Sequence, residues 1–148
     1  MEKRMISCKV ALWVERCVMA VLVALLFLLP SILDWYTGFR FLTGGERLWI
    51  TVSFYCCVVV IGWALWNLDG ILRRILRGEV FVRENVDSIW HIQWCCAAVS
   101  LITLVTCFAY LPLVFLVVIM GFLCLVVNVV GHVMDAAVTI REENDLTI

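Results

Sequence analysis

Four long apolar stretches, separated by short polar segments, make up most of the chain. They cover roughly residues 17–33, 48–68, 89–108 and 113–133. A helix rises about 1.5 Å per residue, so about 20 mostly apolar residues cross the roughly 30 Å hydrocarbon core of a bilayer. Apolar and polar residues do not alternate within these stretches, as they would in the strands of a membrane barrel. The pattern predicts an all-α fold: a single membrane domain, residues 1–148, built as an integral membrane bundle of four transmembrane helices.

The polar segment at residues 69–88 is the predicted connector between spans two and three. Its apolar residues recur at helical spacing opposite the arginines; they are Ile71, Leu72, Ile75 and Leu76. That pattern is typical of a short amphipathic helix lying on the membrane surface. Gly78 is expected to end this helix. The last segment, residues 139–148, is predicted to be a charged, solvated tail.

The basic residues predict the orientation of the chain, because Lys and Arg are biased to the cytoplasmic side of short loops. Of the 11 basic residues, only Arg40 and Arg47 lie between spans one and two; the others lie before span one, in the connector or in the tail. We therefore expect both termini and the connector in the cytoplasm and the protein in the cell membrane. No small-residue cleavage pattern follows the first span, so this span is predicted to be retained.

Composition supports a membrane protein and excludes some functions. The chain is 65% hydrophobic with a mean hydropathy of +1.07, whereas about 45–50% apolar is usual for a soluble domain. Its net charge of -1 argues against direct nucleic acid binding, which needs clustered positive charge. The eight cysteines form no CxxC pair, and we interpret them as small packing residues.

Polar side chains near the cytoplasmic ends of the spans form a candidate polar stripe, because ionisable residues in a span mark a site or a contact. Its members are Asn67 in span two and Asn128, His132 and Asp135 in span four. Residues on each span recur at three- and four-residue steps, so each set lies on one helix face. We expect the two faces to meet each other or the bundle centre. Two interpretations stay open: a functional polar pocket, or helix ends that simply reach head groups and water.

The sequence contains no recognisable catalytic or cofactor motif. Nucleophile motifs, glycine-rich phosphate loops and paired carboxylates are absent, so we do not expect an enzyme. His91 and His132 are the only histidines. They are candidates for haem ligation or, with Asp135 and Cys95, for a metal site. One histidine per helix is not a ligand pattern, so no cofactor and no metal site is predicted.

The connector and the tail resemble domain-of-unknown-function family 2975, an uncharacterised bacterial family of small four-helix membrane proteins. The similarity extends from about the second span to the last residue. The residues that carry it are Gly78, Phe81, Glu84 and Asn85 in the connector, and Ala137, Glu142, Glu143, Asn144, Asp145, Leu146, Thr147 and Ile148 at the end of the chain.

The resemblance implies no established activity. Members are often encoded beside a small helix-turn-helix transcription regulator, which implies a membrane component that acts on a cytosolic regulator. Our leading hypothesis is a non-enzymatic multi-pass protein that regulates or sequesters such a regulator through its connector and tail. The alternative is a homo-oligomeric bundle for small-solute transport or permeation; a third hypothesis is a haem-binding or metal-binding redox protein. Membrane lipids are expected partners in every case.

Overall fold

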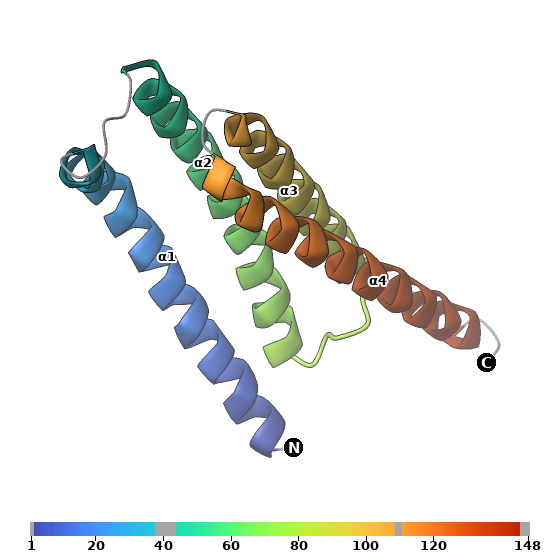
Figure 1. Cartoon of the computed structure of the whole chain (residues 1–148). Coiled ribbons are helices and arrows are strands. Elements are labelled where there is room, and N and C mark those ends of the chain that lie inside the picture. The colour runs from blue at the N-terminus through green and yellow to red at the C-terminus, as the bar shows by residue number, and fades with distance from the viewer. Residues whose placement is uncertain (1, 38–43, 109–110, 146–148) are drawn as a thin grey trace.

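Four long helices account for nearly all of the described chain. The computed structural model describes residues 2–37, 44–108 and 111–145. Each predicted span falls on one helix, with only Phe108 and Leu113 outside the α-helical bounds. All four helices are long and apolar enough to cross a membrane, which confirms the predicted fold class (Figure 1). The elements are α1 (Glu2–Thr37), α2 (Gly44–Leu76), α3 (Arg83–Cys107), the 3-10 turn η1 (Leu111–Leu113) and α4 (Val114–Asp145).

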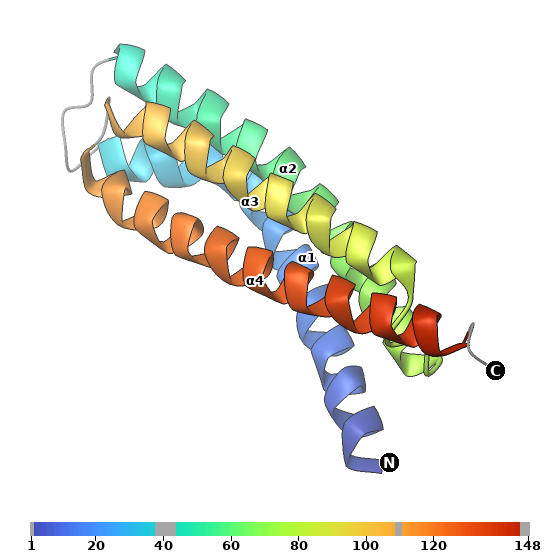
Figure 2. The same ribbon diagram turned by 90° about the vertical axis from the view of Figure 1, so that its right-hand side faces the viewer.

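The helices form an open row in chain order. Among the described residues, α1 packs against α2, α2 against α3, and α3 against α4. Within the described parts of the chain, helix α1 packs directly against neither α3 nor α4, and α2 does not pack against α4. Figure 2 shows the N-terminal turns of α1 extending away from the other helices. The row is therefore held together mainly by α3, its best-packed helix.

The start of α1, the loop between α2 and α3, and the end of α4 lie at the same end of the molecule (Figures 1 and 2). We call this the connector end. Helices α2 and α4 have 33 and 32 residues, or roughly 50 Å each at about 1.5 Å per residue. That length exceeds the roughly 30 Å of hydrocarbon. Because the charged residues of α4 follow its apolar stretch, its surplus turns project at the connector end.

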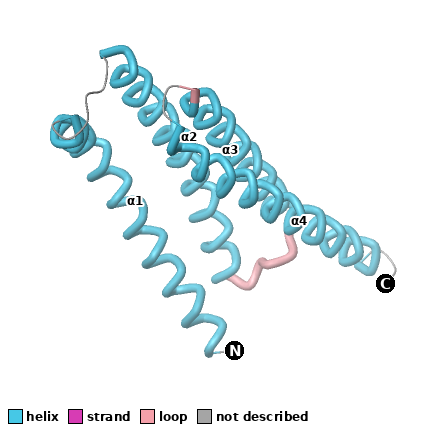
Figure 3. The backbone as a smooth tube through the Cα atoms, in the orientation of Figure 1, coloured by secondary structure: helices cyan, strands magenta, loops and turns pink. Residues whose placement is uncertain are grey.

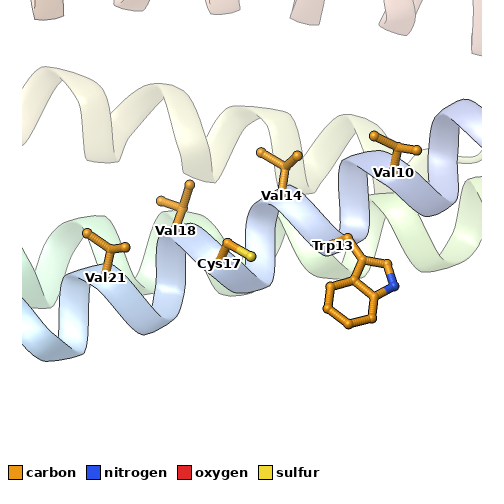
Figure 4. Close-up of a pocket in the computed structure, with 6 residues that line it drawn as sticks. All are labelled: Val10, Trp13, Val14, Cys17, Val18 and Val21. Atoms are coloured by element: carbon orange, nitrogen blue, oxygen red, sulfur yellow. The ribbon is translucent and has the colours of Figure 1, made fainter.

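Most apolar side chains face outward, as expected for a protein whose solvent is lipid. Phe115, Phe122 and Trp13 are each at least 65% exposed. Figure 4 shows one such face on α1, where Trp13 and neighbouring valines border a shallow hollow with no polar lining. In water so large an apolar surface would drive association, so this face is suited to acyl chains. The buried apolar residues are few: Leu29, Val58, Ile71, Val86, Ile89, Val99 and Val138.

Helices α3 and α4 approach each other closely at Gly131. A Cβ atom added to Gly131 would lie only 3.3 Å from Cγ2 of Ile89, so the glycine permits a close approach of the two backbones. Val86 of α3 and Val138 of α4 are almost fully buried in the same half of these helices. The well-packed core therefore lies toward the connector end.

Hydroxyl groups join α2 to α3 toward the opposite end. Oγ1 of Thr106 donates a hydrogen bond of 2.6 Å to Oγ of Ser53, and Thr106 is buried. Between α1 and α2, Arg47 forms an ion pair with Asp34. Such polar contacts give membrane helices a defined register, because the hydrophobic effect supplies little attraction between helices in lipid.

The connector is shorter than the sequence predicted. Residues 71–76 are helical, but they are the last turns of α2, which runs unbroken through Gly70. Ile71 is buried and Arg73 pairs with Asp69 one turn earlier, so these turns are held in the helix. Only residues 77–82 form the loop (Figure 3). The tail is likewise helical through Asp145, and residues 146–148 lie outside the described part of the chain.

Candidate functional site at the connector

Gly78 ends the helix that contains residues 71–76, as the sequence predicts, but this helix is α2 itself and not a separate surface helix. The φ of Gly78 is +87°, a conformation that a residue with a Cβ adopts only at a cost. The amide of Gly78 donates to the carbonyl of Ile75, and the amide of Glu79 donates to that of Arg74, both at 3.0 Å. These two bonds form a Schellman motif, which satisfies the last carbonyls of a helix. The chain therefore turns sharply back toward α3.

Asn85 then holds the loop from inside. Its side chain is fully buried, and Nδ2 donates to the carbonyls of Glu79 at 3.0 Å and Val80 at 2.9 Å. Two loop carbonyls that face the protein interior are thereby paired. A buried polar group without a partner costs about 1–3 kcal/mol, so one side chain at the start of α3 determines the path of the loop.

Arg74 joins α2 to the beginning of α3. Its Nη1 lies 3.4 Å from Oδ1 of Asn85, 3.2 Å from Oγ of Ser88 and 3.3 Å from the carbonyl oxygen of Glu84. Asn85 and Ser88 are both buried. A guanidinium group offers several donors in one plane, which suits such a set of acceptors. The contact fixes the connector against α2 as well as α3.

The same segment is bound to the end of α4. Arg83 forms ion pairs with Asp135 and, at 3.1 Å, with Glu142. Nη1 of Arg141 donates to the carbonyl oxygen of Phe81 at 3.3 Å. The ion-paired side chains are about half exposed, and exposed pairs contribute about 0–1 kcal/mol each. They therefore position the two segments more than they stabilise the fold.

These contacts make up one cluster at the connector end, which we call the connector clasp. Its members are Arg74, Phe81, Arg83, Asn85, Ser88, Asp135, Arg141 and Glu142.

Comparison with protein families places the chain in a known group. The model of a family described as "Protein of unknown function (DUF2975)" matches residues 8–148. The chain belongs to this family. The match includes most of α1, so the similarity is not restricted to the region from the second span onward, as the sequence interpretation had it. No curated protein and no solved structure matches the chain.

Several positions that carry the DUF2975 resemblance lie in the clasp or directly beside it. Gly78 ends α2, Asn85 binds the loop, and Glu142 pairs with Arg83. Phe81 and Glu84 take part through their carbonyl oxygens. Of the remaining tail positions, Glu143 and Asn144 are exposed in the last turn of α4, Asp145 is the last helical residue, and Leu146, Thr147 and Ile148 lie outside the described residues.

The candidate polar stripe is not brought together in this DUF2975 protein. Asn67 donates to the carbonyl of Trp63 on its own helix at 2.9 Å. The expectation that the faces of spans two and four meet is wrong, because the described parts of α2 and α4 do not pack against each other. On α4, Asn128 is half-buried, while His132 is exposed and packs edge-to-face with Trp90 at 5.1 Å between ring centroids. Only Asp135 joins the clasp.

His91 and His132 make separate contacts and do not share a ligand site. Nδ1 of His91 lies 2.7 Å from the carbonyl of Asp87, one turn earlier in α3. Within the described residues, no group of three or more His, Cys, Asp or Glu side chains is placed to hold a metal ion. The histidine-based hypotheses therefore gain no further ligand from the fold.

Sequence reasoning missed the contacts made by the arginines of the clasp. The sequence analysis used Arg74, Arg83 and Arg141 only to predict the orientation of the chain in the membrane. It gave Ser88 no role. An arginine about one turn before a helix-ending glycine, with an asparagine shortly after that glycine, was the available signal for a loop held from both sides.

Proposed function

We propose that this protein is a non-enzymatic membrane protein whose connector end faces the cytoplasm and docks a cytosolic partner. The observation that carries the proposal is the joining of two segments that are 60 residues apart in the chain, at Phe81 and Arg141. A loop that only connected α2 to α3 would not need a contact with α4. The end of α4 would likewise not need a contact with the loop if it only terminated the last span. Together they offer one continuous surface.

The surface combines apolar and charged side chains, as protein-binding surfaces do. Phe81 is 43% exposed in the loop, and Ile140 is 59% exposed near the end of α4. Both lie beside the charged residues of the clasp, since Arg141 follows Ile140 and binds the carbonyl of Phe81. The turn that holds Ile140 belongs to the projecting part of α4, so its side chain is available to a partner in water.

The clasp also reduces the entropic cost of binding. A free loop would lose conformational freedom when a partner docked, at about 0.5–1.5 kcal/mol for each flexible side chain immobilised. Here Asn85 and Arg74 already hold the loop in the free protein. A partner therefore meets a surface that is organised in advance.

The partner that we propose is a helix-turn-helix transcription regulator, which the family resemblance implies. Docking at the membrane would hold the regulator away from DNA, so the protein would act by sequestration and would need no nucleic acid contact of its own. The charged rim formed by Arg83, Arg141 and Glu142 would set the orientation of the regulator and contribute to its specificity.

Crosslinking in native membranes followed by affinity purification tests this proposal. The variants are a chain lacking residues 141–148 and the double variant Phe81→Ala with Ile140→Ala; Ile119→Ala, on the lipid-exposed face of α4, is the matched control. We expect the intact chain and the control to recover a DNA-binding regulator and the other two variants to lose it. Equal recovery by all variants contradicts the proposal. Recovery of only further copies of the chain favours the oligomeric transport alternative.

A further inference from the structure

A groove of about 300 Å³ lies in the half of the molecule opposite the connector end. Leu22 and Leu25 line it from α1, and Leu116 and Met120 line it from α4, the two outer helices of the row. Side chains of α2 and α3 line the rest. All four helices therefore meet at this groove, although α1 and α4 do not pack directly against each other in the described part of the chain.

The groove is lined almost entirely by hydrocarbon. Its three hydroxyl groups are hydrogen-bonded within the protein: Ser53 and Thr106 bind each other at 2.6 Å, and Thr103 donates to the carbonyl of Val99 at 2.7 Å. A polar group that entered would give up its water or head-group partners and find few in exchange, which disfavours its transfer. The groove is therefore suited to an apolar ligand.

The dimensions of the groove match a single hydrocarbon chain. Its lining on α2 extends from Ile50 to Ile61, roughly 16 Å along the helix at about 1.5 Å per residue. This length is close to half of the roughly 30 Å hydrocarbon core, which is the depth of one leaflet. A helix of a second copy does not fit, because a helix about 10 Å across fills on the order of 1,000 Å³ over that length.

We propose that this groove binds one acyl chain of a membrane phospholipid from the leaflet opposite the connector end. Helix α1 packs directly against α2 alone among the described helices. The bound chain would contact Leu25 of α1 and Met120 of α4 at once, and so join α1 to the far side of the bundle. This site lies away from the connector clasp and stands independently of the docking proposal.

Native mass spectrometry of the full chain, released from dioleoyl-phosphatidylcholine nanodiscs, tests the site. Leu116→Trp fills the groove, and Leu125→Trp is the matched control, because nine residues along the helix place Leu125 on the opposite face of α4. We expect one phospholipid per chain to be retained after the freely exchanging lipids are stripped. The retained fraction should fall at least several-fold in Leu116→Trp and stay unchanged in Leu125→Trp. No retained phospholipid in the unmodified chain, or equal retention by the two variants, overturns the proposal.

Photolabelling of the unmodified chain gives a second measurement that needs no variant to fold. The probe is phosphatidylcholine with a diazirine in the middle of one acyl chain, photolysed after exchange into detergent has dispersed the freely exchanging lipids. We expect the crosslinks to fall on residues that line the groove, such as Leu25 and Met120. Crosslinks confined to outward-facing residues of α4, such as Val118 and Phe122, which are each 65% exposed, contradict the proposal.

Discussion

Arg74 of α2 and Asn85 of α3 meet across the connector, with Nη1 of the arginine 3.4 Å from Oδ1 of the asparagine. The amide nitrogen of the same asparagine binds two loop carbonyls. Both ends of the Asn85 amide are therefore used, one toward α2 and one toward the loop. The shape of the connector follows from this pair, and the ion pairs with α4 then place it beside the last turns of the chain.

Replacing Asn85 by alanine should destabilise the protein. The substitution leaves the carbonyls of Glu79 and Val80 without their partner, and each unpaired buried group costs about 1–3 kcal/mol. We expect a loss of about 2 kcal/mol or more in the free energy of unfolding, measured by denaturation in detergent micelles. Asn144→Ala, at an exposed position of α4, is the control and should change stability little. If the two substitutions changed the free energy of unfolding equally, the hydrogen bonds of Asn85 to the loop would not be important for stability.

Gly78→Ala should also destabilise the protein, because φ at this position is +87°. A residue with a Cβ in the left-handed region costs about 1–2 kcal/mol. Gly62→Ala is the matched control, since Gly62 lies inside α2 with nothing within 4 Å of an added Cβ. The control should be neutral or slightly stabilising. The same denaturation measurement distinguishes the two, and a neutral Gly78→Ala would contradict the turn geometry.

Enlarging Gly131 should loosen the contact between α3 and α4. An added Cβ would lie 3.3 Å from Ile89, so Gly131→Val forces the helices apart. We expect a loss of about 1–3 kcal/mol, the usual cost of overpacking. Gly121→Val, where an added Cβ meets nothing within 4 Å, controls for the change in helix propensity. If both valine variants unfold alike in detergent, the close approach at Gly131 is not important for stability.

Arg83→Gln should affect partner binding more than stability. Its two ion pairs are about half exposed, so together they stabilise the fold by roughly 0–2 kcal/mol. The substitution nevertheless releases the connector from α4. We expect nearly normal unfolding together with at least several-fold lower partner recovery after crosslinking. Normal recovery would show that the ion pairs do not organise the docking surface.

The fold was largely predictable because a helix that crosses a lipid bilayer must be apolar over about 20 residues. Each of the four helices is apolar over the length of a bilayer, and that property is visible in a single sequence. The unbroken continuation of α2 through Gly70 was not predictable in the same way. A glycine and a change to amphipathic spacing are both typical of a helix end, yet burial of Ile71 and the pairing of Asp69 with Arg73 keep these turns in the helix.

The candidate site was predictable only in part, because its contacts link distant segments. Gly78 and Asn85 stand out locally, as a helix-ending glycine and a polar residue after it. The pairing of Arg83 with Asp135 and Glu142 depends on which helices are neighbours. Helical periodicity defines the faces of each helix but not the order of packing. For that reason one of the two arrangements expected for Asn67, in which it faces the polar residues of α4, was wrong, because the described parts of α2 and α4 do not pack together.

A charge exchange between Arg83 and Asp135 tests most directly whether the joined connector and α4 form the docking surface. The measurement is the amount of cytosolic partner recovered by crosslinking from membranes that contain Arg83→Glu, Asp135→Arg or both substitutions, at matched levels of inserted protein. We expect each single variant to lose most of the partner and the double variant to regain a substantial part of it, because the ion pair is restored with reversed signs. Recovery that equals that of the unmodified chain in all three variants would contradict the account.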